Sequence, residues 1–348
     1  MKHIKKLSTK LFKKKPQETD VSTRITNETV AEHREKILAG GRRFKYPVQV
    51  AKHRLAIISI AIGVLAVFLL ILIAWQQLYI AQNTSKFLYR VTEIIPVSVA
   101  SVDGADVRYS SYLKKYRSSI FYLQQQNLIN LNSADGRRQS EELIKPRELE
   151  SAERDAYAAK IASQKRITVS NKEVDDFIAK DIARKNISLE AYEKTVLNSF
   201  YDWSLNDYKA VVKSELLKRK VKFAIDTTAE QKANAIYGQL QGGTNFADLA
   251  KAQSEDELTA PSGGDSGTVN TDSEDSNGLI AAAKALTPNQ VSSPVKGADG
   301  YYIVKLNSKT STTVSYSIIK IKLTKFDENF QKLRADGKIK EYITVKRD

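Results

Sequence analysis

Few residues of this sequence have side chains that could act in acid–base, nucleophilic or metal chemistry. The chain has no cysteine, which excludes disulfides, thiol nucleophiles, cysteine-ligated metals and a lipid-modified cysteine anchor. Its three histidines, His3, His33 and His53, all lie in the first 54 residues. The rest of the chain therefore cannot form a Ser-His-Asp triad or a histidine-ligated zinc site. No motif singles out a serine for a Ser/Lys protease, and we expect no metal and no cofactor.

Three stretches have compositions that invite a chemical interpretation. The run Gly263–Gly267 could cradle a phosphate, but it has no lysine and no capped helix after it, so a turn is favoured. The acidic stretch Glu255–Asp275 lacks the spacing of a calcium-binding EF-hand loop, and we expect a solvated loop. Trp203, with Phe200 and Tyr201, could anchor a bound peptide or pack in a core, and core packing is favoured.

The positive charge of the chain is concentrated at its N-terminus. The formal net charge is +15, and residues 1–54 hold 15 Lys/Arg against 5 Asp/Glu, whereas residues 55–348 hold 40 against 35. A basic tail beside a membrane segment follows the topology rules of membrane insertion and attracts anionic lipid. Because the remaining charge is nearly balanced, we expect no nucleic-acid partner. The tail, residues 1–54, is polar and is predicted to be disordered.

A long uncharged stretch follows the basic tail. Leu55–Ser85 has no charged residue, and Leu55–Trp75 is almost continuously apolar. At ~1.5 Å per residue this run covers the ~30 Å hydrocarbon core of a bilayer, and Trp75 and Tyr79 stand where interfacial aromatics are expected. We predict an uncleaved transmembrane helix over residues 55–80. Basic residues crowd its N-terminal side, so the N-terminus is expected in the cytoplasm and the later domains outside the plasma membrane.

Local patterns after the membrane segment indicate helices first and a small sheet later. Capping-box patterns, in which a side chain accepts from a free backbone N–H, predict helix starts at Ser170-x-x-Glu173, Ser204-x-x-Asp207 and Thr227-x-x-Glu230. Alternating β-branched and aromatic residues in Gly300–Leu306 and Thr312–Leu323 predict a pair of antiparallel strands.

These elements predict an α+β protein with separate domains. We expect an all-α domain over residues 97–220 and a small α+β module with an antiparallel sheet over 221–323. A terminal helix within residues 324–348, predicted to reach Ile343, could pack back on the helical domain.

The order of the motifs in the second half resembles the parvulin (PpiC-type) peptidyl-prolyl isomerase domain. The resemblance covers Ala233–Leu306 and rests on these pieces: Gly242–Ala250, Ser254–Asp256, Gly263–Gly267, Ala285–Leu286, Val291–Val295 and Gly300–Val304. The preceding stretches Ile167–Asp176, Asn186–Glu190 and Ser204–Tyr208 are similar to the SurA-type chaperone domain. The chain as a whole resembles the membrane-anchored foldases of the SurA, PrsA and PpiD type.

The resemblance implies a site for twisting an X-Pro bond. In parvulins a polar network includes a histidine on each of two central strands, together with an Asp or Cys. Asp256 fits the last role, whereas Lys222, on an expected strand Val221–Asp226, and Tyr302 stand where the histidines would be. Ser266 and Leu279 fall at positions of the apolar cup that holds the proline ring.

The resemblance also implies a function in protein folding. We expect a membrane-anchored, extracytoplasmic chaperone or foldase that binds unfolded or secreted polypeptides, with membrane lipid as its other contact. One alternative is a catalytically active parvulin-type isomerase, although both histidine positions are replaced. A second alternative is a non-catalytic scaffold of the cell envelope that binds one fixed partner.

Overall fold

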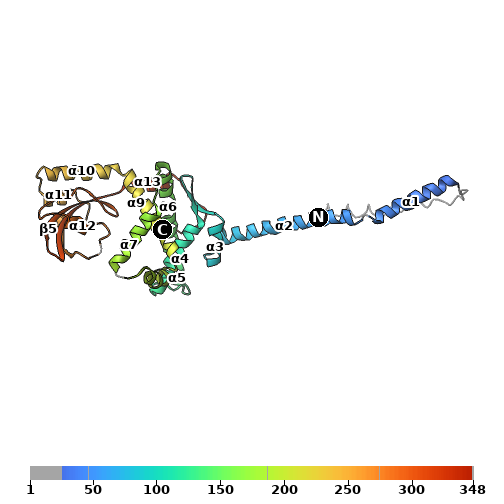
Figure 1. Ribbon diagram of the computed structural model, residues 1–348, viewed down its shortest axis with the longest axis horizontal. Coiled ribbons are helices and arrows are strands. Elements are labelled where there is room, and N and C mark those ends of the chain that lie inside the picture. The colour runs from blue at the N-terminus through green and yellow to red at the C-terminus, as the bar shows by residue number, and fades with distance from the viewer. Residues whose placement is uncertain (1–25, 46, 186, 274, 347–348) are drawn as a thin grey trace. The chain divides into compact units, whose positions relative to one another are not determined.

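A computed structural model of the chain describes residues 26–45, 47–185, 187–273 and 275–346. The chain divides into two compact units, Met1–Ala74 and Trp75–Asp348 (Figure 1). The first part of the predicted basic tail lies outside the described residues. After it, the predicted disorder was wrong for the helix α1 (Asn27–Lys45). Thr26 and Thr29 hydrogen-bond reciprocally at its start and Glu28 lies in its first turn, which are both arrangements that favour a helix N-terminus.

The apolar stretch of the sequence forms one long helix. The helix α2 (Pro47–Trp75) continues into a π-helical turn, η1 (Gln76–Ile80). Within the stretch His53–Ile80, the most apolar window of 18 residues has a mean hydropathy of 3.2 and no buried residue. By length and composition this helix is suited to cross a membrane.

The second unit begins with a helical part, residues 81–226, which is rejoined by residues 324–346; we call the two segments together the helical lobe. The helices of this lobe are α3 (Lys86–Ile94), α4 (Tyr109–Gln125), α5 (Ala134–Gln139), η2 (Ser140–Ile144), α6 (Lys145–Lys165), α7 (Asn171–Lys185), α8 (Leu189–Tyr192), η3 (Glu193–Tyr201), α9 (Leu205–Ile225) and α13 (Lys325–Ala335). The capping boxes predicted at Ser170 and Ser204 are confirmed, since each side chain exchanges hydrogen bonds with the acidic residue three positions later.

The helical lobe also contains a three-stranded antiparallel sheet, so the prediction of an all-α domain was wrong. The strand β1 (Ser98–Val102) lies between β2 (Ala105–Arg108) and β7 (Ile339–Glu341). The terminal helix α13 ends at Ala335 rather than Ile343, because Gly337 takes a left-handed conformation (φ +66°) that turns the chain into β7. Phe326 and Phe330 of α13 are buried in the core of the lobe, beside Tyr157 of α6.

Between these two segments the chain forms a smaller α+β part, residues 227–323, which we call the sheet module. Its helices and strands are α10 (Thr227–Gln241), α11 (Phe246–Gln253), η4 (Ala260–Ser262), β3 (Asp265–Asn270), α12 (Leu279–Lys284), β4 (Val295–Lys296), β5 (Gly300–Lys309) and β6 (Thr313–Lys322). The strands form one antiparallel sheet in the order β3-β6-β5-β4. One face packs on α10 and α11, and the other on α12 (Figure 1). The predicted antiparallel sheet in a mixed α and β protein is confirmed.

The expected strand Val221–Asp226 was wrong, because this segment is the last turn of α9. Leu217, Val221 and Ile225 recur every fourth residue and all pack in the core of the helical lobe, so burial extends the helix. The sheet position beside β5 is filled instead by β6, which follows β5 in the chain. On β6, Ile318 faces the α12 side, whereas Ile319 and Ile321 face α10 and α11.

One buried carboxylate holds the place where the chain enters and leaves the sheet module. Asp226 is 3% exposed, and its Oδ1 accepts a hydrogen bond from the Ala229 backbone N–H at 3.0 Å. Its Oδ2 accepts from the backbone N–H groups of Thr324 and Lys325, at 2.8 and 3.0 Å. The cap of α10 is therefore Asp226, not the predicted Thr227.

We expect Asp226→Asn to destabilise the protein by about 1–3 kcal/mol, because the amide leaves backbone donors of a buried site without an acceptor. The measurement is chemical unfolding of the full-length chain in detergent micelles, followed by circular dichroism. Asp106→Asn, an exposed change on β2, is the matched control and should stay within about 0.5 kcal/mol of the unmodified chain. Equal stability of the two variants would contradict the role given to Asp226.

Candidate functional site

Tyr302 lies at the centre of the sheet module. It stands on β5, opposite Lys320 of β6 and Val295 of β4, and is 3% exposed. Its ring passes so close to Gly297 that a Cβ there would lie 2.5 Å from a ring carbon, so glycine is required for this packing. Leu279, at the start of α12, is buried in the same apolar cluster as Tyr302. These two predicted site residues are thus brought together, but as parts of a filled core.

The Tyr302 hydroxyl belongs to a hydrogen-bonded network that the sequence did not predict. It donates to Asp299 Oδ1 at 2.7 Å, and Lys320 Nζ donates to Asp299 Oδ2, also at 2.7 Å. The Lys320 ammonium lies 5.5 Å from the centre of the Tyr302 ring, within range of a cation–π interaction. Burial raises the pKa of Tyr302, and the hydrogen bond to Asp299 adds to this effect. The hydroxyl therefore remains protonated and acts as a donor.

The Asp299 carboxylate is held in its charged form. Partial burial raises its pKa, but the hydrogen bonds from Lys320 and Tyr302 outweigh this, and the pKa lies below its ordinary value of 3.8. Asp299 and Lys320 thus form an ion pair on the rim of the sheet, with the Lys320 side chain 13% exposed and that of Asp299 58% exposed.

Asp256 lies in the loop that runs beside Lys320. The backbone N–H of Glu255 donates to the Lys320 carbonyl at 2.8 Å, and the Lys320 N–H donates to Ser254 Oγ at 3.1 Å. The Asp256 carboxylate accepts from the Thr259 N–H and hydroxyl, each at 3.0 Å, so it closes a local turn. Its negative charge also contributes to raising the pKa of Tyr302, after burial and Asp299. The charge of Asp256 therefore affects Tyr302, while its carboxylate hydrogen-bonds to Thr259 in the loop.

The other two predicted residues lie elsewhere. Ser266 stands on β3, where its hydroxyl is 3.5 Å from the Gly264 carbonyl oxygen, and no hydrogen bond joins it to Tyr302 in the described part of the chain. Lys222 lies on α9, where it forms an ion pair with Asp327 at 3.2 Å and lies over the Phe326 ring. Its assignment to a central strand was wrong, because the strand opposite Tyr302 is β6 and the residue there is Lys320.

Lys320 and Asp299 were missed because both depend on the strand order. The alternation in Thr312–Leu323 did predict a strand, and antiparallel pairing across the short turn after β5 places Lys320 opposite Tyr302. Counting outward from this turn would not have given the pairing, because the register shifts by one residue between Leu306 and Ser308. Without that shift, Ile321 would stand opposite Tyr302.

The site provides hydrogen-bond donors but no group suited to transfer protons near neutral pH. Imidazole is the side chain with an ordinary pKa in that range, and the three histidines of the chain all precede residue 54. Tyr302 remains protonated and Lys320 is paired with Asp299. The arrangement can polarise a carbonyl at the rim, whereas Leu279, one of the two predicted cup residues, is buried in the same apolar cluster as Tyr302.

Comparisons with known proteins agree with both halves of this architecture. A family model described as the SurA-like N-terminal domain matches residues 49–222, which is half of the chain. A second, described as the PPIC-type PPIase (rotamase) domain, matches residues 217–308. The second match ends within β5, so β6 and Lys320 lie beyond it.

Several relatives match parts of the chain. The periplasmic chaperone PpiD of Haemophilus influenzae is 39% identical over 85 residues, 24% of this chain and 14% of that protein. The foldase protein PrsA of Clostridium kluyveri is 29% identical over 156 residues, 44% of this chain and 42% of its own length. PpiD of Haemophilus ducreyi is 32% identical over 155 residues, 43% of this chain and 22% of that protein. The chain thus spans less than half the length of each of these relatives.

The Asp299 network should weaken in acid. A carboxylate whose pKa is lowered by folding adds stability above its ordinary pKa, and this stability is lost as the pH falls through the folded value. We expect Asp299→Asn to lower the free energy of unfolding by less than ~1 kcal/mol near neutral pH, since this carboxylate is largely exposed. The difference from the unmodified chain should shrink below about pH 3.8. Chemical unfolding at a series of pH values measures it, and a difference that grows on acidification would contradict the network.

Proposed function

The chain belongs to the SurA-like family, and from this premise we propose that it is a membrane-anchored chaperone that binds unfolded or secreted polypeptides outside the cytoplasm. The name of one relative describes a periplasmic chaperone and that of another a foldase. In this chain, a SurA-like helical lobe is joined to a PPIC-type sheet module within one compact unit.

The observation that carries this proposal is the state of the isomerase-like site. Of the two expected cup residues, Ser266 is polar and Leu279 is buried in the core beside Tyr302, and the two central-strand positions hold the buried Tyr302 and the ion-paired Lys320. A catalyst of X-Pro rotation must bind the twisted amide more tightly than the planar forms, which requires an open cup and a polar network aimed at the carbonyl. Binding of non-native chains requires only accessible apolar surface. These residues therefore favour the binding of non-native chains over the catalysis of X-Pro rotation.

Catalytic isomerisation is the second candidate function. It is favoured by the PPIC-type match and by Asp256, whose charge contributes to raising the pKa of Tyr302. Lys320 has ammonium N–H groups beyond the one that it donates to Asp299 and could polarise a substrate carbonyl at the rim, which supports weak activity at most.

Membrane anchoring is part of the proposal and rests on the long apolar helix and the charges that flank it. Lys52 and Arg54 directly precede the apolar run of this helix, which begins at Leu55, and Lys86 is the first charge after it. This asymmetry favours a cytoplasmic N-terminus.

For activity, we expect the full-length chain in detergent to suppress the aggregation of a denatured client while catalysing X-Pro isomerisation poorly or not at all. Light scattering of the client measures the first, and a coupled assay with a proline tetrapeptide measures the second. Suppression should extend to several unrelated clients, whereas a scaffold with one fixed partner would protect none or one. Rapid isomerisation that disappears in Asp256→Ala would instead establish the enzyme function.

For topology, we expect a protease added to intact cells to digest the chain after residue 82 and to spare the N-terminal tail. The positive-inside arrangement of charges around the apolar helix is the reason. An epitope tag at each end, detected by immunoblotting before and after cell lysis, reads out the result. Protection of the C-terminal tag in intact cells would overturn the orientation and with it the extracytoplasmic role.

A further inference from the structure

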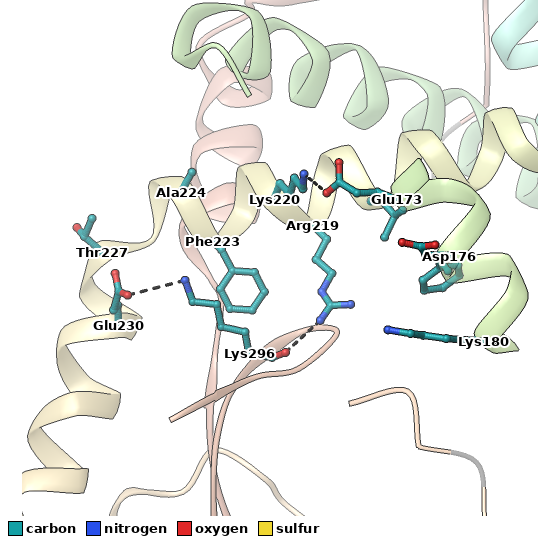
Figure 2. A pocket seen from close by; sticks show the side chains of 12 residues that line it. Glu173, Asp176, Lys180, Arg219, Lys220, Phe223, Ala224, Thr227, Glu230 and Lys296 are labelled. Atoms are coloured by element: carbon teal, nitrogen blue, oxygen red, sulfur yellow. Dashed lines mark hydrogen bonds and ion pairs between the residues drawn. The ribbon is translucent and has the colours of Figure 1, made fainter. Parts of the chain in front are cut away.

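A cleft of about 710 Å³ lies between the helical lobe and the sheet module (Figure 2). It is bounded by α7 and α9 of the lobe, by the start of α10, and by Lys296 at the end of β4. Its apolar lining includes Phe177, Leu216 and Phe223. Phe177 is 42% exposed, although an aromatic side chain is normally buried in a core of this kind. The cleft is therefore an accessible apolar surface.

Packing contacts and one hydrogen bond join the floor of the cleft to the sheet module. The Phe223 ring packs edge-on against Tyr301 of β5, with ring centres 5.1 Å apart. Lys296 lies 5.5 Å from the centre of the Phe223 ring, and its carbonyl accepts a hydrogen bond from the Arg219 guanidinium at 3.0 Å. These contacts join α9 to the turn after β4, so the two sides of the cleft are linked by direct bonds.

The charges around the cleft are not balanced. Its acidic residues are paired: Glu173 with Lys220, Asp176 with Lys172, and Glu230 with Lys296. Within the described residues, Lys180 and Arg219 have no carboxylate at ion-pair distance. Figure 2 shows both of these side chains pointing toward the same open space, Lys180 from α7 and Arg219 from α9. Two positive charges thus remain beside an apolar floor.

Of the two cations, Arg219 has the stronger features of a carboxylate-binding residue. It is half-buried, and burial lowers the pKa of its guanidinium, with the more distant Asp299 acting in the opposite direction. A partly desolvated guanidinium with only one backbone acceptor has unused donors in a planar fork that fits a carboxylate.

We propose that this cleft binds an extended segment of an unfolded polypeptide in which an aromatic or aliphatic side chain is flanked by a carboxylate. The apolar side chain packs on Phe177 and Phe223, and the carboxylate pairs with Arg219 and Lys180. This inference rests on the proposed chaperone function and adds to it a preference for acidic, apolar client segments.

The test compares two fluorescent peptides that differ only in charge, one with the sequence Gly-Ser-Glu-Phe-Glu-Leu-Ser-Gly and one with glutamine in place of each glutamate. Binding to the full-length chain in detergent is measured by fluorescence anisotropy. We expect the acidic peptide to bind more tightly, by roughly 1.4-fold to fivefold for each ion pair that it forms at this partly exposed site. Added salt should reduce this preference, because it screens the carboxylates from Arg219 and Lys180.

Three variants test separately how the two positive charges and the apolar floor contribute to peptide binding. Arg219→Gln and Lys180→Gln should each reduce the preference for the acidic peptide while leaving the affinity for the glutamine peptide within about twofold. Phe177→Ala, at an exposed position, should weaken both peptides equally. Lys251→Gln, on the exposed side of α11, is the matched control and should change neither affinity. Melting temperatures confirm that each variant is folded.

The outcomes distinguish this proposal from the general function. Equal affinity for the two peptides in the unmodified chain, or an equal loss of both in Arg219→Gln, overturns the acidic preference. If neither peptide binds while the chain still suppresses aggregation, the cleft is not the binding site and the chaperone function stands. If aggregation is not suppressed, the chaperone function itself fails.

Discussion

The hydrogen bonds of one buried carboxylate, Asp226, join the two crossings of the chain between the helical lobe and the sheet module. It caps α10, where the chain enters the module, and it accepts from the backbone of Thr324 and Lys325, where the chain returns. A buried acceptor with three donors is stabilising only when all of them are in place, so the entry and the exit must be positioned together. The module is thereby inserted into the lobe rather than appended to it, and α13 can bring Phe326 and Phe330 into the core of the lobe.

The same junction explains how the sheet is completed. Because α9 stays helical up to Ile225 and Asp226 immediately starts α10, no residue is left before the module to form a central strand. The sheet takes this strand from β6, the last segment before the return crossing at Thr324. The expected neighbour of β5 was the segment Val221–Asp226, before the module. The observed neighbour is β6, after β5 in the chain, and Lys320 of β6 lies opposite Tyr302.

Much of the local structure could be predicted from the sequence, because the interactions that decide it are local. The capping boxes at Ser170 and Ser204 and the mixed α and β composition with an antiparallel sheet are of this kind. Lys222 shows where such reasoning fails: Val221–Ile225 has residues suited to a strand, and only its packing in the helical lobe makes it a helix. Asp299 joins the site only once Tyr302 and Lys320 are paired, which is a consequence of strand order rather than of spacing. The cleft at Arg219 likewise combines residues of the lobe and the module, so no local pattern could have indicated it.

The stability of the sheet module and the binding of a client therefore depend on different parts of the molecule. Around Tyr302, the ring fills the space against Gly297 and Leu279, and its hydroxyl and the neighbouring lysine both hydrogen-bond to Asp299. Polar groups used in this way hold the sheet together, and the Tyr302 proton is already donated within the fold. In the cleft beside Lys296, Phe177 is exposed and no carboxylate of the described residues lies at ion-pair distance from Arg219, so apolar area and donors are still available there. Because binding energy comes from surface and donors not already satisfied within the fold, a client should bind beside α7 and α9 rather than at the isomerase-like site.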